Sequence, residues 1–286
     1  MTLPDAAQTI LPTARYARVL TIAGSDSGGG AGIQADLKTI AALGCYGMTA
    51  ITAITAQNTQ GVRAIHALPP ELLAQQIDAV VDDIGVDAVK IGMLHNEAVV
   101  HVVADAIRRH RFPHVVFDPV MVAASGDKLI TESTVDMLVH ELFPLSSLIT
   151  PNLDEARWLL RLGSKSTEAL GEAAHLLHAL GAPAVLLKGG HLPGLTVTDL
   201  LRLPDGRLIH RETPRIPTRN THGTGCSLSS AIAAYLALGE PLADAVHHGL
   251  DYAQAALSAG ADMRLGHGHG PLNHGFAPQA TKRLAL

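Results

Sequence analysis

The sequence is poor in aromatic residues, and its basic residues are outnumbered by acidic ones. Only nine of the 286 residues are Trp, Tyr or Phe, and 21 Lys and Arg stand against 26 Asp and Glu, a formal net charge of -5. Nucleic-acid-binding surfaces need clustered positive charge and aromatic rings on which bases stack. We therefore expect no nucleic-acid partner.

Cysteine and long apolar runs are scarce as well. Cys45 and Cys226 are the only two cysteines, with no Cys-x-x-Cys spacing, which argues against a disulfide framework and a thiolate metal site. No stretch reaches about 18 consecutive apolar residues, and the first eighteen residues lack the apolar centre of a signal peptide. The sequence predicts a cytoplasmic protein with no membrane partner.

What the chain does have is a regular alternation of short apolar runs and helical stretches. The runs that predict strands are residues 19–24, 48–55, 88–91, 114–118, 147–150 and 184–188. The stretches that predict helices are residues 32–43, 70–83, 96–109, 131–142, 153–162, 166–180, 226–238 and 242–259. Strands that are apolar on both faces and joined by helices form a mainly parallel sheet.

We therefore expect a three-layer α/β fold, with helices on both faces of a mainly parallel central sheet. Residues 195–215 contain a Pro-Asp-Gly turn between two short runs, which predicts an antiparallel hairpin at the sheet edge. Gly44 and Gly181 follow two predicted helices as stops. The expected organisation is a flexible N-terminal extension, residues 1–18, followed by a single domain, residues 19–286.

Two glycine-rich segments lie where such a sheet binds ligands, beyond the carboxyl ends of its strands. The first, residues 24–32, fits neither the Walker pattern nor the dinucleotide fingerprint, and a simple tight turn explains it equally well. The second, residues 220–226, runs directly into a helix that is apolar nearly all round. The free amides of Gly223, Thr224 and Gly225 at that helix start predict an anion site. The alternative is that Thr224 or Ser227 caps the helix.

Cys226 lies at the start of the same helix. The helix dipole and free amides favour a thiolate there, so we expect the pKa of Cys226 to fall below about 8.5 and the thiolate to accept a proton. Cys45 is expected to be an inert buried residue.

Three charged residues close other predicted strands or follow them. Asp118 and Glu155 suit Mg²⁺, which takes one or two carboxylates and substrate phosphates. Lys188 ends an apolar strand, and a phosphate is a natural partner for it. The alternatives are a turn acid for Asp118, a helix cap for Glu155 and a structural salt bridge for Lys188. Together these groups indicate phosphoryl transfer.

Seven ordered motifs now make the sequence similar to a known family. They are AGSDSGGGAGIQADLKT (23–39), TAQNT (55–59), KIGML (90–94), DPVM (118–121), TPNLDEA (150–156), KGGH (188–191) and THGTGC (221–226). In this order they resemble the hydroxymethylpyrimidine/phosphomethylpyrimidine kinases of thiamine biosynthesis, members of the ribokinase-like superfamily. The resemblance extends from about residue 19 to residue 274. Ser27 departs from the pattern, since proline is frequent there.

The resemblance implies that ATP with Mg²⁺ phosphorylates 4-amino-5-hydroxymethyl-2-methylpyrimidine to its monophosphate and then to the diphosphate. The residues it implies for the pyrimidine are Gly24, Asp36, Gln57 and Met93. Those it implies for the ATP phosphates are Lys188, Asn152 and Thr221, with Glu155 and Asp118 for magnesium. Gly223, Thr224 and Gly225 would hold the transferring phosphoryl group, and Cys226 would be the catalytic base.

Two other functions stay open at this point. One is a vitamin B6 kinase of the same superfamily, which phosphorylates another hydroxymethyl-bearing ring. The other is a non-catalytic nucleotide-binding sensor. The apolar stretch 48–56 also makes a homodimer plausible.

Overall fold

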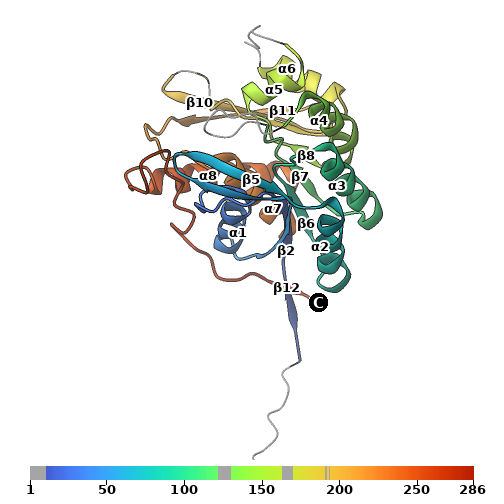
Figure 1. The fold of residues 1–286 in the computed structure, drawn as a ribbon. Helices are drawn as coiled ribbons and strands as arrows, with labels where there is room; N and C mark the ends of the chain where they lie inside the picture. Colours follow the sequence, from blue (N-terminus) through green and yellow to red (C-terminus); the bar gives the residue numbers. More distant parts are fainter. Residues whose placement is uncertain (1–10, 122–129, 163–169, 191, 193) are drawn as a thin grey trace, which may run out of the picture.

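The computed structural model describes residues 11–121, 130–162, 170–190, 192 and 194–286. Its centre is an eight-stranded sheet with the strand order β11-β10-β9-β8-β7-β6-β2-β3 (Figure 1). The strands are β2 (Arg18–Ala23), β3 (Tyr46–Ile51), β6 (Ala88–Ile91), β7 (Val115–Phe117), β8 (Leu148–Ile149), β9 (Val185–Leu187), β10 (Thr196–Arg202) and β11 (Leu208–Pro214). The six strands from β9 to β3 pair in parallel, and the β10–β11 hairpin is antiparallel at the edge. The predicted α/β class and edge hairpin are confirmed.

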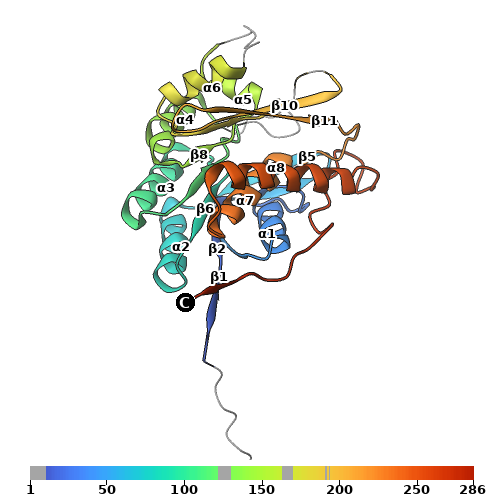
Figure 2. The same ribbon diagram turned by 180° about the vertical axis from the view of Figure 1, so that it is seen from behind.

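Helices cover both faces of this sheet (Figures 1 and 2). Their bounds are α1 (Gly32–Ala42), α2 (Pro70–Asp83), α3 (Glu97–His110), α4 (Glu132–Met137), α5 (Leu153–Leu159), α6 (Leu170–Ala179), α7 (Thr224–Ala237) and α8 (Leu242–Ala259). Residues of α1, α7 and α8 share one hydrophobic core, and residues of α2 to α6 share the other. Strands such as β6, in which all four residues are buried, lie between the two cores, as their unbroken apolar runs predict. No helix in the described part of the chain has the length and apolar character to cross a membrane.

Two small sheets complete the fold. β4 (Ala53–Asn58) and β5 (Gly61–Ala67) form an antiparallel hairpin outside the main sheet. β1 (Ala14–Tyr16) pairs antiparallel with β12 (Arg283–Ala285), so that these two segments, far apart in the sequence, lie side by side (Figure 2). Residues 14–16 of the predicted flexible extension therefore belong to a strand.

Several predicted boundaries were wrong. The single strand expected at residues 48–55 is two strands, because the chain leaves the main sheet at Thr52 and continues in β4. The helix expected to reach residue 142 changes after Met137 to a π-helical turn, Leu138–Leu142, followed by a 3-10 turn, Phe143–Leu145. Helix α5 ends at Leu159, three residues early. The predicted start of the helix at 166–180 lies outside the described residues, and the rest of it forms α6.

The predicted helix stops at Gly44 and Gly181 are confirmed. Both have a positive φ, 79° and 108°, which side chains other than glycine rarely adopt. Gly44 follows α1 and Gly181 follows α6, so each lets the chain turn back toward the sheet.

Candidate active site

A cavity of about 820 Å³ opens beyond the carboxyl ends of the parallel strands. Segments that follow β2, β6, β7, β8 and β9 line it, together with the β4–β5 hairpin, the β10–β11 hairpin, and parts of α7 and α8. This is the edge of an open parallel sheet at which ligands bind. Nearly all the residues singled out in the sequence line it: Gly24, Gln57, Met93, Asp118, Asn152, Glu155, Lys188, Thr221, Gly223, Thr224, Gly225 and Cys226.

The start of α7 has the properties of an anion site. Gly223 is its N-cap in the left-handed region, φ 83°, and no side chain caps the helix. The hydroxyl of Ser227 donates to the carbonyl oxygen of Gly223 at 2.8 Å, and that of Thr224 donates to the carbonyl oxygen of Thr221 at 2.7 Å. The alternative that Thr224 or Ser227 caps the helix is therefore wrong. Of the amides expected to bind an anion, that of Thr224 already donates to the carbonyl oxygen of Thr221 at 3.2 Å, so the expectation is wrong for that amide. The amides of Gly223 and Gly225 are left to meet a ligand at the positive end of the helix dipole.

Lys188 and Asp118 face this helix start from the sheet. Lys188 Nζ donates to Asp118 Oδ1 at 2.9 Å, and Thr150 Oγ1 donates to the same oxygen at 2.9 Å. A Cβ atom on Gly225 would lie 3.2 Å from both Lys188 Nζ and Asp118 Oδ2. Burial alone would lower the pKa of Lys188, but Asp118 and Glu155 outweigh it and the pKa is raised. Lys188 is therefore a charged ammonium group next to the α7 amides.

Glu155 is both a cap and a cavity residue. Asn152 and Glu155 form a capping box at the start of α5, in which Glu155 N donates to Asn152 Oδ1 at 2.8 Å and Asn152 N donates to Glu155 Oε2 at 2.7 Å. Burial raises the pKa of Glu155 to about 7, Lys188 opposes the rise, and Asp118 adds to it. The cap expected as an alternative function is thus present, and it also holds this carboxylate near Asp118.

The carboxylates of Asp118 and Glu155 fit a magnesium ion that comes with a nucleotide. No cluster of three or more His, Cys, Asp or Glu side chains with metal-binding geometry occurs among the described residues. Mg²⁺ binds in such surroundings by keeping several waters and taking one or two carboxylates together with substrate phosphates.

Cys226 differs from the sequence-based expectation. Its pKa is raised to about 11, because burial penalises the thiolate more than Lys90 and a backbone hydrogen bond from Gly32 favour it. The predicted lowering of this pKa was wrong, because burial of the thiol outweighs the stabilisation of a thiolate by the helix dipole. Cys45, the other cysteine, is buried with its pKa raised to about 12, again by burial, as expected of an inert residue.

Asp36 also differs from expectation. Its side chain is fully buried and does not reach the cavity wall, because it neutralises Lys90. Lys90 Nζ lies 2.9 Å from both oxygens of Asp36, which also accept hydrogen bonds from Thr21 at 2.6 Å and Ser230 at 2.8 Å. The pKa of Lys90 is raised: burial alone would lower it, and the nearby anions, Asp36 above all, outweigh that.

Lys90 borders the cavity and was missed as a site residue. The signal was available, because Lys90 interrupts an apolar strand just as Lys188 ends one. Asp26 and His222 were missed too: both border the cavity, and Asp26 Oδ2 lies 2.8 Å from His222 Nε2. Asp26 and His222 are 196 residues apart in the sequence, and their contact is seen only in the folded protein. Residue spacing along the chain could not have predicted it.

The cavity wall is tightly packed around Gly24. A Cβ atom on Gly24 would lie 2.7 Å from the Cε atom of Met93, so the two residues define one side of the cavity. Gln57 lies on β4, where Thr55 Oγ1 donates to its Oε1 atom at 3.3 Å.

Comparison with known proteins decides the family. Residues 26–273 match the family model described as phosphomethylpyrimidine kinase. The chain belongs to this family. The hydroxymethylpyrimidine/phosphomethylpyrimidine kinase of Rhizobium meliloti is 50% identical over 256 residues, covering 89% of this chain and 96% of the relative. The family predicted from the motifs, and with it the expectation of a kinase, is confirmed.

Two further matches bear on how far the likeness extends. The thiamine biosynthesis bifunctional protein ThiED of Geobacter sulfurreducens is 51% identical over 265 residues, or 92% of this chain, but the chain spans only 53% of that protein's length. The structure of Bacillus subtilis pyridoxal kinase in complex with ADP superposes with a TM-score of 0.83 at 36% identity, covering 91% of this chain and 98% of the other. The likeness in fold therefore includes a vitamin B6 kinase that binds a nucleotide.

Proposed function

We propose that this member of the phosphomethylpyrimidine kinase family uses ATP to phosphorylate 4-amino-5-hydroxymethyl-2-methylpyrimidine and then its monophosphate, yielding the diphosphate for thiamine biosynthesis. The observation that carries the proposal is the uncapped start of α7 beside Lys188, with Cys226 in the same first turn. Half of the cavity would hold the nucleotide and the other half the acceptor. Its volume of about 820 Å³ lies within the range of ligand sites.

The donors at the α7 start are suited to the charge of phosphoryl transfer. The transferring group spreads negative charge over its equatorial oxygens, and catalysis depends mainly on positioned donors and cations. The amides of Gly223 and Gly225 would hold these oxygens, and Lys188 would neutralise the phosphates from the opposite side. Asn152 and Thr221 border the same region and would contact the nucleotide phosphates.

Magnesium would be held by Asp118 and Glu155 together with the phosphates. When bound, the ion neutralises negative charge on the phosphate oxygens. A nucleotide complex would keep Glu155 ionised, since a cation beside a carboxylate favours its charged form.

Cys226 would act as the base for the first phosphorylation only. In that step the acceptor hydroxyl forms a bond to the γ-phosphorus, the bond to the ADP oxygen breaks, and the hydroxyl proton passes to the thiolate. In the second step the acceptor phosphate already carries negative charge and needs little help. Because the pKa of Cys226 is about 11, the thiolate is a minor form at neutral pH, and we expect a base contribution near the lower end of the usual range, about 10²-fold.

The pyrimidine would lie against Gly24 and Met93 with its amino group and ring nitrogen paired to the amide of Gln57. An amide can donate and accept in parallel, as Gln does with adenine. Asp36 would act on this region through Lys90, since its carboxylate does not border the cavity.

Vitamin B6 phosphorylation is the second candidate, and the likeness to Bacillus subtilis pyridoxal kinase is the observation that favours it. A non-catalytic nucleotide sensor is disfavoured, because Lys188, Glu155 and Cys226 are all present around one cavity. The homodimer stays a prediction that a mass measurement in solution would test.

A coupled ADP-release assay across pyrimidine and pyridoxal acceptors tests the proposal, with the phosphates on each product counted by mass spectrometry. We expect two successive phosphates on the pyrimidine and a higher kcat/KM for it than for pyridoxal. Preference for pyridoxal would establish the B6 kinase instead. ADP release with neither acceptor would leave only the sensor.

A further inference from the structure

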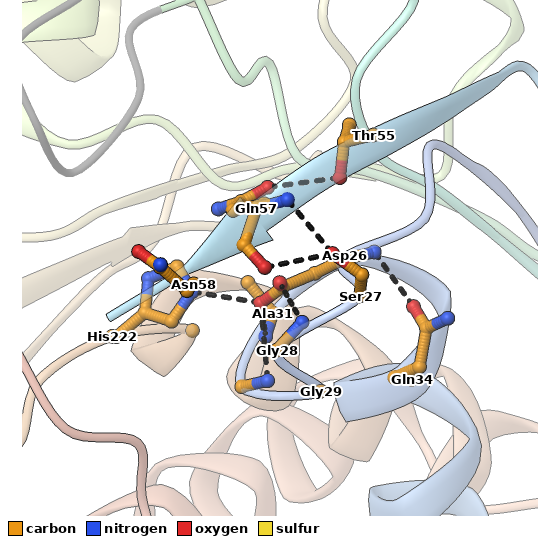
Figure 3. Close-up of polar contacts among 12 residues, drawn as sticks. Asp26, Ser27, Gly28, Gly29, Ala31, Gln34, Thr55, Gln57, Asn58 and His222 are labelled. Atoms are coloured by element: carbon orange, nitrogen blue, oxygen red, sulfur yellow. Dashed lines mark hydrogen bonds and ion pairs between the residues drawn. The ribbon is translucent and has the colours of Figure 1, made fainter. Parts of the chain in front are cut away.

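The carboxylate of Asp26 ties the glycine loop that precedes α1 to the start of α7. Oδ1 accepts a hydrogen bond from Gly28 N at 2.8 Å, and Oδ2 accepts from Gly30 N at 3.0 Å and Ala31 N at 2.9 Å. Oδ2 also lies 2.8 Å from His222 Nε2 (Figure 3). Only 1% of Asp26 is exposed, so these bonds are shielded from water.

The charge of Asp26 is maintained by these donors. Burial alone would raise the pKa of Asp26, but the hydrogen bond from His222 and those from the loop amides outweigh it, and the pKa is lowered. A carboxylate that accepts four hydrogen bonds holds its donors in place more firmly than a neutral acceptor would.

The two segments that Asp26 joins are in direct backbone contact. A Cβ atom on Gly223, the N-cap of α7, would lie 1.9 Å from the carbonyl oxygen of Gly30. A Cβ atom on Gly30 would lie 2.6 Å from the Cδ2 atom of His222. Neither position has room for a side chain, so a shift of the loop would displace the start of α7.

Both segments then continue into the proposed reaction centre. Gly32, the residue after Ala31, donates a backbone hydrogen bond to the thiol of Cys226. Gly223, the residue after His222, begins the turn whose amides would hold the transferring phosphoryl group. The Asp26–His222 pair is therefore connected through the backbone both to the Cys226 thiol and to the α7 amides. These two groups must keep a fixed distance from each other during phosphoryl transfer.

The acceptor side is attached to the same loop. Ser27 Oγ donates to the carbonyl oxygen of Gln57 at 2.7 Å and accepts from Gln57 N at 2.7 Å (Figure 3). Gln57, the residue proposed to pair with the pyrimidine, is thus fixed relative to Asp26. Ser27 is the position where the family often has proline, which has no hydroxyl to make these bonds.

We propose that Asp26 and His222 form a positioning pair for phosphoryl transfer, holding the glycine loop against the start of α7 so that Cys226 and the α7 amides stand in register with the acceptor. The proposal rests on the proposed function. The pair acts through the backbone of Gly32 and Gly223, and its oxygens are already occupied by protein donors. Its loss therefore lowers kcat more than it weakens binding, because positioned donors contribute mainly to the transition state.

The test compares His222→Phe, which keeps a ring without the Nε2 donor, with His222→Gln, whose amide can still donate to Asp26. We expect His222→Phe to lower kcat for the first phosphorylation roughly 30-fold, the loss of one hydrogen bond to a charged group, with both KM values within about threefold. His222→Gln should stay within about fivefold of the wild type. The matched control is His248→Phe, because His248 makes a similar 2.7 Å contact with Glu240 on the protein surface, and it should leave kcat unchanged.

A double-mutant cycle measures whether the effects of the two substitutions on kcat are additive, which a loss of protein stability alone would not change. If the pair acts as a unit, Asp26→Asn together with His222→Phe should be no slower than the slower single variant. If His222→Phe does not fold, the comparison of Asp26→Asn with His222→Gln gives the same test.

Two results would overturn the proposal. One is an equal loss of kcat in His222→Phe and His222→Gln. The other is a fall in melting temperature or a rise in KM with kcat retained, which would make the pair a structural anchor. The wild-type enzyme is assayed first with each acceptor, so failure of the proposed function is seen before any variant is compared.

Discussion

Two lysine–aspartate pairs lie at the same cavity, one bordering it through Lys90 alone and the other through both Lys188 and Asp118, and they differ in how many of their hydrogen-bonding atoms have protein partners. Lys90 lies 2.9 Å from both oxygens of Asp36, and neither side chain is exposed. Lys188 contacts only Oδ1 of Asp118, and 15% of its side chain remains exposed. The first pair is closed within the protein, and the second is open on the side where a ligand would enter.

The two aspartates also differ in the number of hydroxyl groups that donate hydrogen bonds to them. Asp36 accepts from Thr21 and Ser230 in addition to Lys90, so its acceptor sites are filled by the protein. Asp118 accepts from Thr150 at Oδ1, and no described residue donates to its Oδ2 atom. A buried lysine in an apolar strand is therefore not by itself a phosphate site. Lys188 differs from Lys90 because its partner, Asp118, has one oxygen atom to which no described residue donates, and because both lie beside the start of α7.

Replacing Lys188 should have the largest effect on activity. We expect Lys188→Met to lower kcat/KM roughly 10³-fold, because a cation next to the transferring charge is lost. The measurement is ADP release at saturating acceptor, with urea unfolding as the control for folding. Near-normal kcat/KM would mean that Lys188 is only a structural salt-bridge partner.

Replacing Lys90 should act on stability. We expect Lys90→Met to lower the free energy of unfolding by about 3–5 kcal/mol, because Asp36 is left as an unpaired buried charge. Lys90→Met combined with Asp36→Leu should recover much of that loss, since an apolar pair needs no neutralisation. Urea unfolding measures both. Full stability with lost activity would place Lys90 among the groups that touch the substrate.

The smallest predicted effect comes from a matched pair of isosteric changes. Thr21→Val and Thr150→Val each remove one hydroxyl donor to an aspartate, Asp36 in the first case and Asp118 in the second. Thr21→Val should lower unfolding free energy by about 1.5–3 kcal/mol with kcat retained, since it removes a hydrogen bond to a charged group. Thr150→Val should chiefly raise KM for ATP, by a few-fold. The reverse pattern would contradict the distinction between the closed and the open pair.

Much of the fold could be predicted from sequence because its signals are local. Helices 70–83 and 242–259 have the predicted bounds, and the Pro-Asp-Gly turn marks the β10–β11 hairpin. The exit of the chain at Thr52 into β4 could not be predicted, because the apolar pattern continues through it. The pairing of β1 with β12 joins opposite ends of the chain, which no local pattern records.

The candidate site likewise has features that the sequence predicts and features that only the packed structure shows. Lys188, Asp118, Glu155 and the α7 start were found because each follows a strand or begins a helix, and the topology brings such positions together. The burial of Asp36 against Lys90 and the raised pKa of Cys226 depend on which side chains seal the site from water. Desolvation is a property of the packed protein, and spacing along the chain does not predict it.

The most direct test of the account is a single-turnover measurement of both phosphorylations with Cys226→Ala. We expect the first phosphorylation to slow by about 10²-fold while the second changes by less than about threefold, because the hydroxyl acceptor must lose a proton and the acceptor phosphate already carries negative charge. Equal losses in the two steps would contradict a proton-accepting function for Cys226 and leave the α7 start as an anion site alone.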